Sequence, residues 1–91
     1  MGAVLANIAE VKAGLSQVME QASGAAVGLR AAADDAERSL QQLRACLSGT
    51  NHPRALQSLI QVQQRKERLI EAADLAEQAT VAIRAYVAVL G

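Results

Sequence analysis

One short stretch decides the fold: residues 48–53, which read Ser48-Gly49-Thr50-Asn51-His52-Pro53. Gly49 can take the left-handed backbone conformation that ends a helix, and Pro53 suits the first turn of the next helix. His52 stands at or beside the N-cap of that helix, where we expect Thr50 or Asn51 to supply the capping oxygen. The stretch is the strongest interruption of helical sequence in the chain. It therefore predicts a sharp reversal between two helices.

Apolar residues recur at helical spacing on both sides of this turn. Steps of seven before the turn connect Ile8, Leu15, Ala22, Leu29, Ala36 and Leu43. Steps of seven after it connect Val62, Leu69, Ala76, Ile83 and Leu90. Such a row drifts around a straight helix of 3.6 residues per turn, so we expect gently packed helices rather than a tight supercoil. The pattern predicts one domain, 1–91, with a helix at 3–47, a turn at 48–53 and a helix at 54–90.

The predicted fold class is all-α, an antiparallel two-helix hairpin that dimerises into a four-helix bundle. Glycines inside the first helix weaken it, and Ser23-Gly24 is the weakest point. A break there would produce a three-helix bundle, which is the alternative. Gly24 and Gly28, with the alanines beside them, also form a patch of small side chains. The patch would let a helix approach closely, and that helix could be the second one of this chain or a partner's.

Charged residues provide a test of the hairpin register. In an antiparallel pair that turns near residues 50 and 51, residue i lies opposite residue 101 minus i, within two positions. The rule places Arg65, Lys66 and Arg68 beside Asp34, Asp35 and Glu37, and it places Glu71, Asp74 and Glu77 near Arg30. Pairs within the first helix, from Arg30 to Asp34 and from Asp34 to Arg38, would satisfy the same groups. Both accounts are open at this point.

The composition argues against several classes of function. Twenty residues are alanine and Tyr86 is the only aromatic residue, so the chain has little bulk with which to wall a substrate pocket. Nine basic and nine acidic residues cancel, which disfavours nucleic-acid binding. His52 is the single histidine and Cys46 the single cysteine, so a metal site and an intrachain disulfide are not expected. We expect no enzyme activity, no cofactor and no small-molecule substrate.

Hydropathy gives expectations about membranes and export. The apolar windows are interrupted by Arg30 and Arg84 well before the ~18 to 20 residues that a membrane-spanning helix needs. Residues 1–12 lack the features of a secretory signal peptide. We therefore expect no membrane span, and a protein that is cytoplasmic or is secreted without a cleavable signal peptide.

A hairpin covers only one side of each apolar stripe, so the sequence predicts a helical partner, either a second copy or a related protein. Residues before about 10 would have no counterpart on the second helix. The predicted interface consists of Val4, Leu5, Ile8, Val11, Leu15, Val18, Met19, Leu56, Ile60, Ile70 and Val81. The predicted function is that of a non-enzymatic protein-protein interaction module. The alternative is a cytoplasmic dimeric adaptor, antitoxin-like or scaffold subunit that binds another protein through the same face.

The position of Gly49 near the middle of the chain and the two long helical segments carry a resemblance. The chain resembles the small Trp-x-Gly proteins of ESX-type (type VII) export systems and related actinobacterial hairpin proteins of unknown function. The resemblance covers the whole chain and is architectural, because no Trp is present and Leu90 stands where the export signal after Tyr86 would have an acidic residue. It implies homodimers or heterodimers, and a protein that is secreted or secretion-associated.

Overall fold

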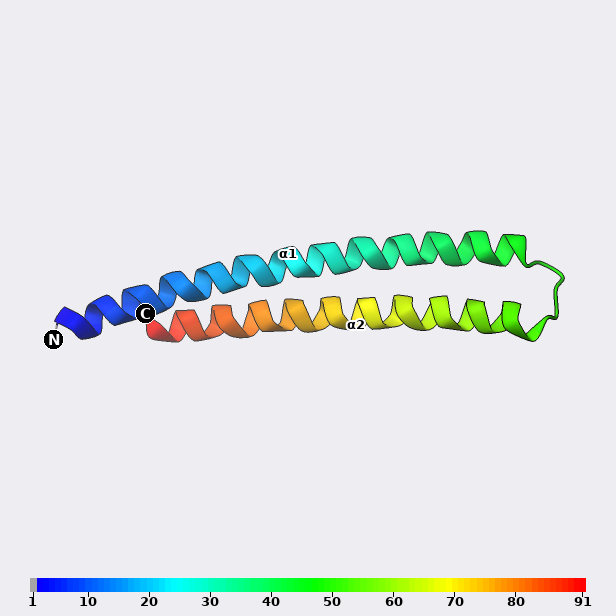
Figure 1. The fold of residues 1–91 in the computed structure, drawn as a ribbon. Coiled ribbons are helices and arrows are strands. Elements are labelled where there is room, and N and C mark those ends of the chain that lie inside the picture. The colour runs from blue at the N-terminus through cyan, green and yellow to red at the C-terminus, as the bar shows by residue number, and fades with distance from the viewer. Residues whose placement is uncertain (1) are drawn as a thin grey trace.

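The computed structural model describes the backbone of residues 2–91 and the side chains of residues 7–91. It is an antiparallel hairpin of two helices, α1 (Gly2–Cys46) and α2 (Pro53–Leu90), which lie side by side along their lengths (Figure 1). The rod measures 72 × 15 × 15 Å. The prediction of an all-α hairpin is confirmed. The helices begin and end one residue or less from the predicted positions.

The first helix is continuous through Ser23 and Gly24, so the alternative of a three-helix bundle is wrong. An interior glycine costs about 1 kcal/mol of helix stability relative to alanine. Packing opposes that cost, because Ala26, two residues after Gly24, and Ala33, one heptad later, are buried between the helices. The predicted interface residues Val4 and Leu5 lie outside the residues whose side chains the structure describes.

The reversal between the helices is built largely as the sequence predicts. Gly49 has a φ of 84°, in the left-handed region that favours glycine. Pro53 begins α2, and His52 is its N-cap residue. The predicted source of the cap is wrong: the imidazole Nδ1 of His52 accepts a hydrogen bond from the backbone N–H of Arg54 (3.2 Å), and Thr50 Oγ1 instead accepts from the backbone N–H of His52 (3.4 Å). Asn51 is exposed.

The two helices meet along a seam whose inward positions alternate strictly by three and four residues. The seam positions, all buried or half-buried, are on α1 Ile8, Lys12, Leu15, Met19, Ala22, Ala26, Leu29, Ala33, Ala36, Leu40, Leu43 and Leu47, and on α2 Ala55, Leu59, Val62, Lys66, Leu69, Ala73, Ala76, Thr80, Ile83, Val87 and Leu90. This spacing averages 3.5 residues, which is that of a coiled-coil seam. The expectation that the helices pack gently rather than in a tight supercoil stays a prediction.

The seam buries little apolar volume. The buried residues of the described chain are Ala26, Ala33, Leu40, Ala73 and Thr80. Leu40 is the largest of them, and it is 1% exposed. The hydroxyl of Thr80 donates to the carbonyl of Ala76 one turn earlier, at 3.1 Å, so its polar group is satisfied. Among residues 7–91, ten of the larger apolar side chains are exposed to solvent, and nearly all of the others are only half-buried.

Candidate interaction surfaces

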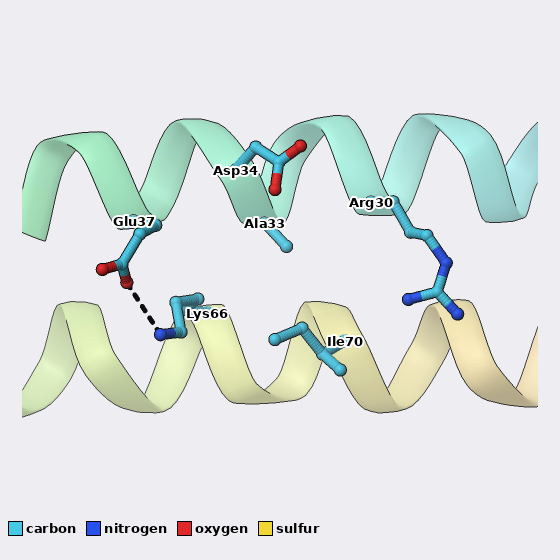
Figure 2. A pocket seen from close by; sticks show the side chains of 6 residues that line it. All are labelled: Arg30, Ala33, Asp34, Glu37, Lys66 and Ile70. Carbon is cyan, nitrogen blue, oxygen red and sulfur yellow. Dashed lines mark hydrogen bonds and ion pairs between the residues drawn. The ribbon is translucent and has the colours of Figure 1, made fainter.

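One side of the rod, which we call the ion-paired flank, carries the charges that join the helices. Its positions are 16, 20, 23, 27, 30, 34, 37, 41 and 44 on α1, and 56, 60, 63, 67, 70, 74, 77, 81 and 84 on α2. The guanidinium of Arg30 donates to Asp74 and to Glu77, each at 2.8 Å. The ammonium of the seam residue Lys66 donates to Glu37 at 2.7 Å, as Figure 2 shows.

These pairs shift the pKa values of the groups that form them. The hydrogen bond from Lys66 lowers the pKa of Glu37, and the hydrogen bond from Arg30 lowers the pKa of Glu77. The hydrogen bonds to Glu77 and Asp74 raise the pKa of Arg30. Each shift favours the charged form of the group. Because Arg30 and both of its partners are about half exposed, we read the pairs as setting the register of the helices more than as a large stabilising force.

The charge prediction is confirmed in part. The expected contacts between helices form at Glu37 with Lys66 and at Arg30 with Asp74 and Glu77. The predicted grouping around Asp34 and Asp35 does not form: Asp35 pairs with Arg38 three residues later on α1. Arg30 therefore reaches across to α2 instead of along its own helix to Asp34.

A hollow of about 320 Å³ lies on the ion-paired flank and is lined by Arg30, Ala33, Asp34, Glu37, Lys66 and Ile70 (Figure 2). It is open to solvent, and its polar groups are partly used in the ion pairs described above. The pairs hold Arg30 and Lys66 toward carboxylates of the facing helix. The hollow is thus a feature of how the helices are joined.

The opposite side of the rod, which we call the uncharged flank, carries no charged side chain over a long stretch. Its positions on α1 are Asn7, Val11, Gly14, Val18, Gln21, Ala25, Gly28 and Ala32, and on α2 they are Ala72, Leu75, Ala79, Ala82, Tyr86 and Val89. Both rows have the same 3.5-residue spacing as the seam. Residues 7–32 of a helix extend for about 38 Å. Every charged residue of this half of the rod lies at the seam, on the ion-paired flank or on the back of a helix.

Large apolar side chains of the uncharged flank are exposed. Val11 and Val18 are 46% and 45% exposed, and Leu75, Tyr86 and Val89 are more exposed than that. A hollow near the chain termini is lined by Asn7, Ile8, Val11, Tyr86 and Leu90. Asn7 and Ile8 thus lie near the C-terminal end of α2, but α2 ends at Leu90, so the start of α1 extends past it, as the sequence predicted (Figure 1).

Glycines on α1 face outward rather than toward α2. A Cβ added to Gly14, Gly24 or Gly28 would meet no atom within 4 Å. The idea that Gly24 and Gly28 lie under the second helix of the same chain is therefore wrong, although Ala26 and Ala33 of the same patch do lie there. Gly14 and Gly28 belong to the uncharged flank, and Gly24 lies on the back of α1.

The predicted interface residues fall into three groups. Ile8, Leu15 and Met19 are half-buried at the seam between α1 and α2. Val11 and Val18 are exposed on the uncharged flank. The remaining ones, Leu56, Ile60, Ile70 and Val81, are exposed on the ion-paired flank, among charged neighbours. Contact of any of them with a partner stays a prediction. The alignment of Leu75, Tyr86 and Val89 with Val11 and Val18 was not predicted, and it becomes visible once the seam is known and each charged residue is assigned to one side of it.

Other predicted groups have simple placements. Cys46 is exposed at the end of α1 with its thiol free. Among the described residues, no three His, Cys, Asp or Glu side chains gather in a way that could hold a metal ion. Neither described helix is long and apolar enough to cross a membrane.

Comparison with known protein families, with curated proteins and with solved structures finds no match. The resemblance to ESX-type hairpin proteins therefore stays a prediction.

Proposed function

We propose that this chain is a non-enzymatic interaction module that works by docking its exposed apolar rows against other helices. The observation that carries the proposal is the imbalance between the core and the surface. The seam fully buries one side chain larger than alanine or threonine, Leu40, whereas ten large apolar side chains among residues 7–91 are 37% to 82% exposed. Covering apolar surface contributes about 25 cal/mol per Å².

The geometry suits association rather than chemistry on a small molecule. The hollows on the rod are open to solvent and lie along the sides of two helices, and a long, narrow surface of this kind matches another helix better than a compact ligand. A rod only two helices thick leaves each helix with one side covered, and a four-helix bundle made by two hairpins covers a second side.

The test is the mass of the purified chain in solution, measured by light scattering over a range of concentrations. The proposal predicts an associated species at micromolar concentration, with a mass of twice 9.5 kDa for the homodimer. A folded chain that stays at 9.5 kDa at the highest attainable concentration, and that binds no helical protein, would contradict it.

A further inference from the structure

We propose that the uncharged flank is the contact surface for a second copy of this chain, and that the two rods lie parallel, with both turns at the same end. This inference rests on the proposed function and adds to it the surface and the orientation. The two-fold symmetry axis would run parallel to the rods, so that α1 of each copy lies against α2 of the other. Each residue then lies at the same distance along the rod in both copies.

Charge is the first argument for a second copy as the occupant. An uncharged surface can face itself without burying an unpaired charge or placing like charges together. The ion-paired flank cannot do so, because Glu20, Arg30, Asp34, Glu37, Asp74 and Glu77 are distributed along it. Since both flanks carry exposed apolar side chains, the distribution of charge decides which one pairs with itself.

Size complementarity is the second argument. The contacts of Arg30 with Asp74 and of Glu37 with Lys66 show that residues whose numbers add to about 103 lie at the same level of the rod. The outer positions of the flank are those farther from the seam. In the parallel arrangement, each outer position on α1 of one copy then faces the outer position at the same level on α2 of the other copy: Gly14 with Val89, Gln21 with Ala82, and Gly28 with Leu75. Each small residue would receive a larger one. Val89 and Leu75 are 82% and 65% exposed, and the space above both glycines is open.

Toward the turn, the outer row of each helix, which is the one farther from the seam, supplies opposite charges. The next outer position on α1 is Asp35, and its level partner is Arg68 on α2 of the other copy. Beyond them, Gln42 is level with Gln61. All of these residues are exposed within one hairpin. An antiparallel arrangement would instead place α1 against α1 and would lose both the alternation of small and large side chains and the pairing of Asp35 with Arg68.

The available area is adequate for a stable dimer. A flank 72 Å long and 15 Å wide offers on the order of 1,000 Å² on each copy, against about 800 Å² per partner in a standard interface. The uncharged half would form the dry centre of the contact, and the residues near the turn would form its polar edge.

Mixed disulfide trapping tests the orientation. In a Cys46→Ser background, one preparation carries Gly28→Cys and a second carries Leu75→Cys, and the two are mixed and oxidised. Both positions are exposed, and circular dichroism of each preparation checks the fold. The expected result is a covalent dimer in the mixture and little in either preparation alone. The control mixture of Gly14→Cys with Gly28→Cys should not cross-link, because a contact between those two requires antiparallel rods.

A charge exchange gives a second readout that does not depend on cysteine. Asp35→Arg alone places two arginine pairs in its homodimer, and Arg68→Asp alone places two aspartate pairs there, so each should weaken self-association about tenfold or more. Mixing the two variants should restore a dimer, because both contacts in the mixed species are then opposite in sign. Failure of the mixture to recover association overturns the proposed orientation.

The outcomes separate the inference from the proposed function. A dimeric mass with cross-linking between residues 14 and 28, or with no cross-linking between residues 28 and 75, overturns the inference and leaves the interaction module in place. A chain that is monomeric and binds no helical protein overturns both.

Discussion

The two flanks of this rod contain similar apolar residues and differ in their charges. Val81 on the ion-paired flank and Leu75 on the uncharged flank are 62% and 65% exposed, so neither exposure nor hydropathy separates them. What separates them is the surroundings: Val81 lies near Asp74 and Glu77, whereas the row of Leu75 carries no charge from residue 72 to residue 89. The ion pairs of one flank set how the two helices of a hairpin align, and the other flank is the one that we propose meets a second copy.

The largest expected effect lies at the seam beneath both flanks. Leu40→Ala removes the largest fully buried side chain and should lower the free energy of unfolding by about 2–5 kcal/mol. Val27→Ala, at a position that is 70% exposed, should change it by less than about 0.5 kcal/mol. Urea unfolding followed by circular dichroism measures both. Equal losses for the two variants would show that the seam is misplaced.

A charge placed on each flank tests the comparison directly. Leu75→Glu should weaken self-association about 100-fold or more, because the dimer would bury an unpaired carboxylate in each copy. Val81→Glu, its matched control on the other flank, should have little effect on association. Sedimentation velocity of the two variants gives the answer. Equal weakening by both would remove the distinction between the flanks.

Two glycines on α1 separate helix propensity from contact. Gly24→Ala should stabilise the chain by about 0.5–1 kcal/mol, because the added methyl group meets no atom within 4 Å and the residue lies on the back of the helix. Gly28→Leu should improve the helix similarly and still weaken the dimer, because it fills the space that Leu75 of the other copy would occupy. Thermal melting and light scattering follow the two effects. If Gly28→Leu associated more strongly than the unmodified chain, the proposed contact between Gly28 and Leu75 of the other copy would be wrong.

The smallest expected effect is a pH dependence of the ion-paired flank. The pKa values of Glu37 and Glu77 are lowered in the folded chain from an ordinary value of 4.5. Their stabilising contribution is therefore present above the pKa of the unfolded chain and is lost as pH falls through the lower folded value. Melting temperature measured from about pH 6 to about pH 3 should fall, and it should fall less for a Glu37→Gln, Glu77→Gln double variant. Identical curves would show that these pairs contribute nothing measurable.

Local chemistry explains which parts of the fold the sequence predicted. Gly49 and Pro53 have strong backbone preferences, so the turn and the helix ends could be placed from them. The sequence left the continuity of α1 at Gly24 open, because a local cost of about 1 kcal/mol competes with packing that depends on distant residues. His52 was not expected to cap α2 with its ring nitrogen, because Thr50 and Asn51 are the commoner capping residues.

The interaction surface was predicted only in part, and the reason is geometric. The spacing of Ile70, Val81 and Val11 predicts that all three are exposed apolar residues. The spacing alone does not say on which side of the rod each one lies. Once the contact of Arg30 with Asp74 fixes the register, each charged residue can be assigned to a flank. The absence of charge from one side of residues 7–32 and 72–89 then becomes visible.

Small-angle X-ray scattering of the unmodified chain tests the central claim most directly, because it gives mass and length in one measurement. Two parallel rods joined through the uncharged flank predict a mass of about 19 kDa, twice 9.5 kDa, with a maximum dimension within about 10 Å of the 72 Å length of one hairpin. A mass of 9.5 kDa, or a doubled mass with a dimension of about 90 Å or more from antiparallel rods that overlap along their uncharged halves, would contradict it.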